Sequence, residues 1–371
     1  MRIFVYEFVT GGGFLGTDSL PPSSLLAEGQ AMVSALVDGL SQIEGCTVSA
    51  MWDRRLLALD LPIGNVPPCH SGLAVTLGTP QRAFPTEFYE VSNAENERAI
   101  FRRLAAEADW TVVIAPEFDG HLHTRTVWVR DVGGRLLGPG PDLVALTADK
   151  QRTGQHLAAA VVPVPASRLV VEHEPLPVDF PYPAVLKPVD GAGSQGAGSQ
   201  NVELIHSAAE AISPSDQPRL LERFCPGTAA SVAVLCGPGG HVILPACRQH
   251  LSEDGRFRYL GGSLPLEPAL AERARSLATR AIDSLHDPFG YIGIDLILGE
   301  AEGGNHDVVI EINSRLTTSY VGLRMAANEN LAAAMLDVAV GRQISLSFRD
   351  KPLQFDATGV SVTGSQAPLG G

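Results

Sequence analysis

The sequence predicts a chain that joins an α/β unit to an α+β unit, and two observations support this. In residues 1–117, apolar strand-like segments alternate with helix-like segments, which is the pattern of a parallel sheet covered by helices. From about residue 182 onward the pattern changes to short strands, with strong helical segments only at 268–285 and 330–342. We therefore expect a parallel sheet first and a mixed, strand-rich region after it.

The first unit contains three expected strands and two expected helices. The strands are residues 2–9, 46–53 and 109–117, and the helices are residues 24–42 and 93–108. Pro21 and Pro22 precede the first helix, and Ser23 or Ser24 is its expected N-cap. Ligands of such parallel sheets bind near the carboxyl ends of the strands.

The second unit begins with an expected helix near residues 145–160, followed by a proline-rich link. Two strong strands are expected at 290–298 and 306–314, and the helix at 330–342 closes the core. Residues 61–72 are rich in turn-forming residues and are expected to be a loop. Residues 363–371 are small, polar and rich in proline and glycine, so we expect a disordered tail.

The composition excludes several classes of partner. The 371 residues carry a formal net charge of -14 without an offsetting basic cluster, which argues against nucleic acid or an anionic membrane as partner. The five cysteines are odd in number and have no CxxC spacing, which indicates reduced thiols in a cytoplasmic protein. No segment has the roughly 18 continuous apolar residues that a membrane span needs.

A lysine and a glycine-rich loop follow one another in "VLKPVDGAGSQGAGS". The apolar strand delivers Lys187, and glycines at 191, 193, 196 and 198 follow at once. Such glycines let backbone N–H groups turn toward an anion, while the lysine supplies a charge for phosphate oxygens. The loop is not a Walker A motif, because the lysine precedes the glycines. On this loop alone, a phosphate cradle and a surface hairpin are equally well supported.

Acidic residues interrupt two apolar strands near the end of the chain. Asp295 lies within "YIGIDLIL", and Glu311 and Asn313 stand two apart in "VVIEINSRLTTS", so they project from the same face of their strand. If the strands pair, these side chains offer three oxygen ligands of the kind that Mg²⁺ prefers. Pairing with arginines is the alternative, but carboxylates in apolar strands favour the metal interpretation. Arg315 continues on the same side and is suited to bind a phosphate or an oxyanion.

A strand, a bend and a second strand are expected in "RLLERFCPGTAASVAVL". The bend can expose backbone groups to an adenine edge, with Leu220 and Phe224 as apolar cover. The segment gains significance from its position between the Lys187 loop and the acidic strands.

Taken in order, these segments resemble the ATP-grasp superfamily of ligases. The matching elements are "TADKQRTGQHL" with Lys150, "VLKPVDGAGSQG", "LLERFCPG", "YIGIDLIL" and "VVIEINSRLTTS", and they extend from about Ala145 to Gly341. The resemblance implies an ATP-grasp fold with an N-terminal parallel-sheet (pre-ATP-grasp) domain. It also implies ATP and Mg²⁺ (or Mn²⁺) as cofactors, with ATP lying between two α+β subdomains.

The resemblance assigns roles to the residues of these motifs. Lys150 and Lys187 contact the nucleotide phosphates, Lys187 and Arg315 act in catalysis, and Asp295, Glu311 and Asn313 hold the metal. The closing loop includes Gly191, Gly193, Ser194, Gln195 and Gly196, and the adenine hinge is Glu222, Arg223, Phe224 and Cys225. Many family members carry a glutamate for the ribose where this chain has Ala229, so ribose recognition is unassigned.

The resemblance also implies a division of the chain. Residues 1–110 form a Rossmann-like pre-ATP-grasp domain, and residues 111–185 form a central region with the first ATP lysine. Residues 186–230 form the small ATP-grasp subdomain, residues 231–350 form the C-terminal subdomain with the metal site, and residues 351–371 form an extension.

The reaction that the resemblance implies is amide formation. A substrate carboxylate takes the γ-phosphoryl group of ATP, giving an acylphosphate and ADP, and an amine then displaces phosphate. Charge neutralisation and alignment suffice for this chemistry, so no serine or cysteine nucleophile is expected. The alternatives are a ligase of another acid, a biotin-carboxylase-like enzyme and a non-catalytic nucleotide-binding module.

Further segments resemble one branch of the superfamily, which includes the tyramine–glutamate ligases of methanofuran biosynthesis. They are "YEFVTGGGFLG", "PPSSLLAEGQAM", "APEFDGHL", "RQHLSEDGRFRYLGGSLP" and the end of the acidic strand, "EINSRLTTSY". The implied acid is glutamate, and the implied amine is tyramine or a tyrosine-like amine. The expected partners are these small molecules, with no nucleic acid and no membrane, and a homodimer is left open.

The candidate substrate residues come from these segments. They are Gly11, Gly12, Gly13, Glu28, Glu117, Arg248, Tyr259, Gly261, Thr317 and Thr318. The triple glycine is interpreted as a backbone wall that faces the acceptor substrate. Glu7 and Glu28 either hold an ammonium group or fix the glycine loop, or they are only a surface acid and an acid of a helix's first turn, and these interpretations stay open. Arg248 either binds a substrate carboxylate or lies on the surface, and Tyr259 either lines the pocket or belongs to the core.

Overall fold

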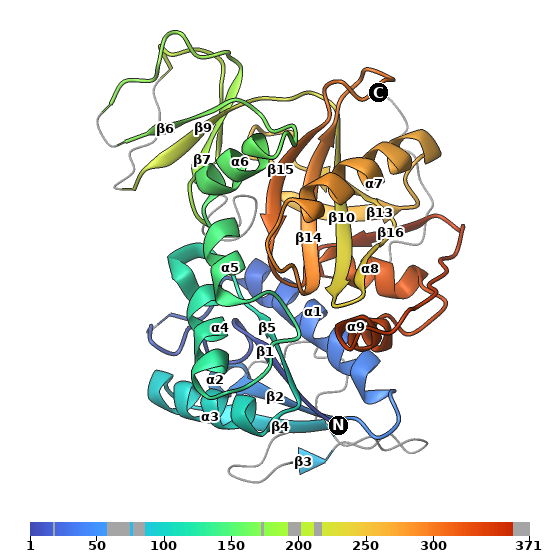
Figure 1. Cartoon of the computed structure of the whole chain (residues 1–371). Helices are drawn as coiled ribbons and strands as arrows, with labels where there is room; N and C mark the ends of the chain where they lie inside the picture. The colour runs from blue at the N-terminus through green and yellow to red at the C-terminus, as the bar shows by residue number, and fades with distance from the viewer. Residues whose placement is uncertain are drawn as a thin grey trace, which may run out of the picture.

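The computed structural model contains three β-sheets and the helices that cover them (Figure 1). It describes residues 1–17, 19–57, 75–76, 86–171, 174–191, 202–210 and 217–358. Several predictions lie outside these residues: the loop at 61–72, the disordered tail at 363–371, and the roles of Gly193, Ser194, Gln195 and Gly196.

The first sheet belongs to the N-terminal domain. Four of its strands are parallel, in the order β4-β2-β1-β5: β1 (Arg2–Glu7), β2 (Thr47–Asp53), β4 (Thr86–Val91) and β5 (Trp110–Ile114). The two-residue strand β3 (Val75–Thr76) pairs antiparallel with β4. The helices of this domain are α1 (Ser23–Ser41), α2 (Arg54–Leu57), α3 (Ala94–Glu107) and α4 (His121–Asp131), with a short 3₁₀ turn at Phe118–Gly120. The predicted parallel sheet is confirmed. The short, half-exposed strand β4 was not predicted.

Two short helices connect the N-terminal domain to the rest of the chain, where one helix was expected. They are α5 (Pro141–Thr147) and α6 (Lys150–Ala159). The break falls at Asp149, whose side chain accepts the backbone N–H of Arg152 and so caps α6. This cap places Lys150 at the first residue of α6.

The small sheet is antiparallel and holds β6 (Ser167–Val170), β7 (Ala184–Pro188), β8 (Glu203–Ile205) and β9 (Arg219–Arg223) in the order β6-β9-β7-β8. Its core includes Val170, Leu186 and Leu221, all buried. In Figure 1 this sheet projects from the top of the molecule, beside α6.

The large sheet has the order β15-β14-β10-β12-β13-β16, with β11 paired to β10. Its strands are β10 (Thr228–Gly237), β11 (Gly240–Ile243), β12 (Cys247–Leu251), β13 (Tyr259–Leu264), β14 (Gly290–Leu298), β15 (Val308–Asn313) and β16 (Leu353–Asp356). Helix α7 (Pro268–Asp283) packs on one face, and α8 (Ser319–Ala326) and α9 (Leu331–Ala339) pack on the other. The chain therefore does not end its core at the last helix, because β16 follows and buries Phe355.

Helix α1 connects the two halves of the molecule. Its residues Val33 and Leu36 belong to one hydrophobic cluster with Val5 of β1 and with Tyr320 of α8 and Met335 of α9. Asn330 also donates a hydrogen bond to the carbonyl oxygen of Gly39 at 2.8 Å. The first sheet and the large sheet thus share one core.

Two further predictions concern the whole chain. None of the helices within the described ranges is long and apolar enough to cross a membrane. Four cysteines are described, Cys46, Cys225, Cys236 and Cys247, and each is a free thiol.

Candidate active site

Two acidic side chains face one another where β14 and β15 pair. Asp295 lies opposite Glu311 in the ladder, and a bulge follows Asp295. Asn313 Nδ2 donates to Asp295 Oδ2 at 3.0 Å, and Gln249 Nε2 donates to Asp295 Oδ1 at 2.9 Å. Burial, together with the nearby Glu311, raises the pKa of Asp295 to about 6. The strand pairing thus brings together all three predicted metal ligands.

This donor set fits a hard cation. Two carboxylates this close in a buried position are costly unless positive charge compensates them. The described residues contain no group of three or more histidine, cysteine, aspartate or glutamate side chains suited to a metal. A cation here therefore needs the Asn313 amide and oxygens from a bound ligand, which is how Mg²⁺ commonly binds beside phosphates.

The two predicted phosphate lysines lie near this pair, and each is held by an acid. Lys150 Nζ lies 3.0 Å from Glu311 Oε1 and also donates to the carbonyl of Gly191. Lys187 Nζ donates to Glu222 Oε1 at 2.7 Å, and both lysine side chains are buried. Glu222 was predicted to read adenine, whereas its carboxylate here neutralises Lys187. Of the predicted hinge, Arg223, Phe224 and Cys225 then remain as candidates to contact a nucleotide base.

A largely apolar cavity of about 160 Å³ lies between the small and large sheets. Val185, Phe224, Phe257 and Leu296 are among its apolar lining residues, and Lys150, Lys187, Arg256 and Glu311 are among its charged ones. The rings of Phe224 and Phe257 stack with centroids 5.9 Å apart and an interplanar angle of 22°. This shape and its polar end suit a flat base with phosphates attached.

The hinge segment contributes backbone and side chain to this cavity. Arg223, Phe224 and Cys225 all line it. However, the N–H groups of Arg223 and Phe224 donate to the carbonyls of Ala166 and Pro183 at 2.8 and 2.9 Å. Those two amides are therefore already used inside the protein. Ala229 also lines the cavity, and its methyl group offers a ligand neither a donor nor an acceptor.

A second, more polar cavity of about 70 Å³ adjoins the first. The two share Gln249, Asp295 and Glu311. The second is also lined by Glu28, Met32, Ser231, Cys247, Tyr259, Asn313, Arg315, Thr317, Thr318 and Ser319. The carboxylate pair thus lies on the boundary between an apolar and a polar chamber.

Arg315 is fixed from the N-terminal domain. Its Nε donates to Glu117 Oε1 at 2.8 Å, and its terminal nitrogen donates to Asn313 Oδ1 at 3.4 Å. Burial opposes the charged form, but the ion pair with Glu117 together with the nearby Glu311 and Asp295 outweighs it, so the pKa of Arg315 is raised. Glu117 was predicted to contact substrate, and its observed contact is with Arg315. The guanidinium therefore stays charged at the wall of the polar cavity.

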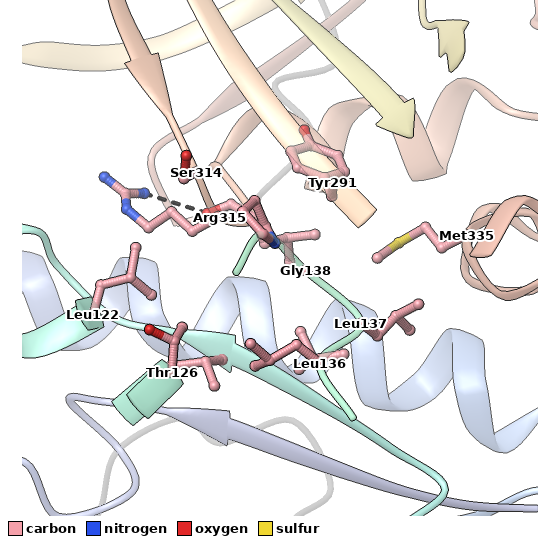
Figure 2. Close-up of a pocket in the computed structure, with 13 residues that line it drawn as sticks. Leu122, Thr126, Leu136, Leu137, Gly138, Tyr291, Ser314, Arg315 and Met335 are labelled. Carbon is pink, nitrogen blue, oxygen red and sulfur yellow. Dashed lines mark hydrogen bonds between the residues drawn. The ribbon is translucent and has the colours of Figure 1, made fainter. Parts of the chain in front are cut away.

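A small, largely apolar pocket lies beside Arg315. Figure 2 shows this small pocket, of about 10 Å³, with Leu122 and Thr126 of the N-terminal domain facing Tyr291 and Met335. Its size is near that of a single water molecule, so it belongs to the packing between the two halves rather than to a ligand site.

The triple glycine is packed against the protein itself. A Cβ added at Gly11 would lie 2.5 Å from the carbonyl oxygen of Glu7, and one at Gly13 would lie 2.3 Å from the ring of Phe8. Gly12 has φ +103°, and its Cβ would lie 2.7 Å from Leu15 and Val91. None of the three glycines lines either chamber. Their role as a wall facing the substrate stays a prediction.

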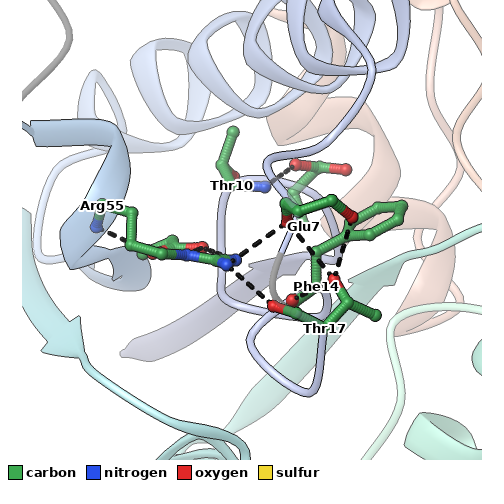
Figure 3. A network of polar contacts seen from close by, with 7 residues as sticks. Glu7, Thr10, Phe14, Thr17 and Arg55 are labelled. Atoms are coloured by element: carbon green, nitrogen blue, oxygen red, sulfur yellow. Dashed lines mark hydrogen bonds and ion pairs between the residues drawn. The ribbon is translucent and has the colours of Figure 1, made fainter.

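The glycine loop is held by polar contacts at both ends (Figure 3). The Glu7 carboxylate accepts the N–H groups of Val9 and Thr10 at 3.0 and 2.7 Å. Arg55 pairs with Asp53 at 2.8 Å and donates to the carbonyl of Thr17 at 3.1 Å. Glu7 is buried, so it is not a surface acid, and of the remaining interpretations the structure supports the one in which it fixes the loop.

The other candidate substrate residues divide into two groups. Glu28, Tyr259, Thr317 and Thr318 line the polar chamber. Gly261 has φ +139° and lets β16 approach, because its Cβ would lie 2.2 Å from the carbonyl of Phe355. The Arg248 guanidinium lies 3.5 Å from Thr228 Oγ1, and Arg248 is not among the lining residues of either chamber.

Several lining residues were missed by sequence reasoning. They are Met32, Ser231, Cys247, Gln249, Arg256, Phe257 and Ser319. The alternation of side chains along a strand could have indicated Gln249. Neighbouring residues point to opposite faces, so Arg248, which was predicted to bind substrate, and Gln249 cannot both face the cavity. Phe257 carries none, because it reaches the cavity from an irregular turn between β12 and β13 with φ +52°.

Comparisons with known proteins agree with this architecture. A family model described as ATP-grasp domain matches residues 147–319, and one described as pre ATP-grasp 3 domain matches residues 73–144. The tyramine–L-glutamate ligase of Methanocaldococcus jannaschii is 24% identical over 251 residues, which are 67% of this chain and 68% of that protein. That of Methanocaldococcus fervens is 24% identical over 66% of this chain and 70% of its own length.

Solved structures share the fold. A putative ATP-grasp superfamily protein from Archaeoglobus fulgidus matches with a TM-score of 0.66 at 19% identity, covering 96% of this chain and 92% of its own. An L-amino acid ligase from Bacillus licheniformis matches with a TM-score of 0.58 at 16% identity, covering 91% of this chain and 73% of its own. With the two matching domain models, the paired acids and the buried lysines, the chain belongs to the ATP-grasp superfamily of ATP-dependent ligases.

Proposed function

We propose that this chain is an ATP-dependent carboxylate–amine ligase that activates an acid as an acylphosphate and transfers the acyl group to an amine. The observation that carries the proposal is the meeting of two chambers at the Asp295–Glu311 pair. The apolar chamber suits the nucleotide, and the polar chamber suits the acid and the amine. The γ-phosphate of a nucleotide held this way would point toward the acid.

A divalent cation belongs at the same pair. Asp295, Glu311 and Asn313 would hold Mg²⁺ or Mn²⁺, which supplies charge neutralisation for the phosphates when bound. Lys150, beside Glu311, and Lys187 would bind phosphate oxygens in the same cavity. Because both lysines are buried beside an acid, they are placed within the site before any nucleotide arrives.

Arg315 is the residue best placed to act on the acid. Its guanidinium lines the polar chamber and is held in one orientation by Glu117. A fixed, charged fork of donors can orient a carboxylate for attack and stabilise the charge that develops during phosphoryl and acyl transfer. No described residue is required as a covalent nucleophile in this scheme.

Glutamate and tyramine are the first substrates to test. The proposal rests on the named activity of the two relatives at 24% identity and on the resemblance described for the glycine and "EINSRLTTSY" segments. The expected product is a γ-glutamyl amide of tyramine. Another acid or amine in the same reaction would keep the ligase assignment and change only its specificity.

The test is ADP release in the presence of Mg²⁺, measured with acid and amine together and with each alone. We expect rapid release only with both, and mass spectrometry should find a product equal to glutamate plus tyramine minus water. Release of AMP and pyrophosphate would refute the scheme. ADP release with bicarbonate and no amine would instead support a biotin-carboxylase-like activity.

A further inference from the structure

Glu28 is an acid of the polar chamber that has no protein partner among the described residues. It lies on α1, is 7% exposed, and lines the chamber together with Arg315. Other acids nearby have protein partners: Glu7 accepts two backbone N–H groups, Glu117 pairs with Arg315 through Oε1, and the half-buried Glu311 pairs with Lys150. The Glu28 carboxylate thus faces a chamber without a hydrogen bond or an ion pair within the described structure.

A buried carboxylate without a partner is costly, because desolvation disfavours its charged form. Burial raises the pKa of Glu28 to about 8. Arg315, the basic residue that lines this chamber, directs one donor each to Glu117, Asn313 and the carbonyl of Leu316, and it makes no hydrogen bond or ion pair with Glu28. Structural stability therefore gives no reason for an acid here, whereas an incoming cation does.

The surroundings of Glu28 indicate what kind of cation would fit. Met32 lies four residues further along α1, on the same helical face, and lines the chamber with Glu28 and the ring of Tyr259. An apolar wall beside a single carboxylate suits an organic ammonium ion, which has a charged end and a carbon chain. The oxygen ligands proposed for a metal, Asp295, Glu311 and Asn313, line the same chamber, but Glu28 makes no hydrogen bond with any of them.

We propose that Glu28 recognises the protonated amino group of a substrate, so that this chamber accepts a primary ammonium compound, with Arg315 available for a carboxylate. This inference rests on the proposed ligase function, in which both substrates carry such a group. The α-ammonium group of the acid and the ammonium group of the amine share this chemistry. The test must therefore separate the two sources.

Glu28→Gln keeps the shape of the side chain and removes its charge, and Glu44→Gln, an exposed position just beyond α1, is the matched control. Loss of a hydrogen bond between charged groups predicts a rise of about 10- to 100-fold in KM for the substrate whose ammonium group binds Glu28. The KM for ATP should stay within about twofold of wild type. Glu28→Asp should recover part of the loss.

Two analogues identify the source of the ammonium group. Glutarate is glutamate without its amino group, and hydroxylamine is an amine acceptor that is uncharged at neutral pH. If the acid binds Glu28, the wild-type preference for glutamate over glutarate disappears in Glu28→Gln. If the amine binds it, the preference for tyramine over hydroxylamine disappears instead. The inference would be overturned if Glu28→Gln kept both substrate preferences and both KM values within about twofold of those of wild type.

Failure of the ligase proposal would look different. In that case the wild-type protein releases no ADP with any acid and amine pair. Calorimetric binding of glutamate and of tyramine to wild type and to Glu28→Gln then decides the matter. If either compound binds the variant more weakly than it binds wild type, the Glu28 inference is supported. If both compounds bind the two proteins equally well, or if neither protein binds either compound, the inference is refuted.

Discussion

Replacing Gly29 with alanine should destabilise the protein, although alanine is the better helix former. A Cβ at Gly29 would lie 2.6 Å from Glu7 Cδ and 2.7 Å from each carboxylate oxygen. Glu7 is 3% exposed, and its oxygens accept the N–H groups of Val9 and Thr10, so the carboxylate has no free direction in which to move. The added methyl group must therefore displace either α1 or the anchor of the glycine loop.

The magnitude follows from three terms. Overpacking costs about 1–3 kcal/mol, loss of one hydrogen bond to a charged acceptor costs about 1.5–3 kcal/mol, and helix propensity returns about 1 kcal/mol. The expected loss in the free energy of unfolding is therefore roughly 2–5 kcal/mol, measurable by urea denaturation followed by circular dichroism.

Gly154→Ala is the matched control for this prediction. Gly154 also lies inside a helix, α6, and no atom is found within 4 Å of its added Cβ. We expect this variant to gain up to about 1 kcal/mol. A Gly29→Ala protein as stable as wild type, or stabilised like the control, would refute the assignment of Glu7 as a fixed anchor.

Three other predictions concern activity and pH. Glu311→Gln should abolish turnover while leaving nucleotide binding measurable by calorimetry, whereas a non-catalytic binding module would keep its function. Phe257→Ala removes the ring stacked on Phe224, so KM for ATP should rise about tenfold with little change in KM for the acid, as initial rates will show. Burial raises the pKa of Glu28 to about 8, above the unfolded value near 4.5, so the native state holds a proton that the unfolded state releases. Stability should therefore fall as pH rises from 6 to 8, by about 1–2 kcal/mol, and urea titrations of Glu28→Gln should show a smaller fall.

The parallel sheet and the acidic strands were predictable because their signals are local. Buried β1 and β5 read as apolar runs, and β14 was predicted with its observed bounds, because a strand covered on both faces leaves a continuous apolar pattern. The convergence of Asp295, Glu311 and Asn313 followed from period-two spacing and an assumed pairing, which the register confirms.

The parts that escaped prediction depend on contacts between distant segments. Glu117 meets Arg315 across 198 positions of sequence, and no local pattern links the two. The glycine loop resembled a ligand-binding loop, although its glycines are required by the close approach of Phe8 and the Glu7 carbonyl. The sequence predicted the charged Arg248 as a site residue, whereas Gln249 lines the cavity. Neighbouring residues of a strand point to opposite faces, and charge does not reveal which of the two faces the cavity.

Helix α1 has a consequence for how such a protein can change over time. The helix presents Glu28 and Met32 to the polar chamber, and Met32, Val33 and Leu36 all belong to the core common to both sheets. A new substrate preference gained through Glu28 or Met32 must therefore be compatible with a helix that the ATP-binding half also needs. Exchange of the first 110 residues between relatives would transfer specificity only together with a matching surface on α8 and α9.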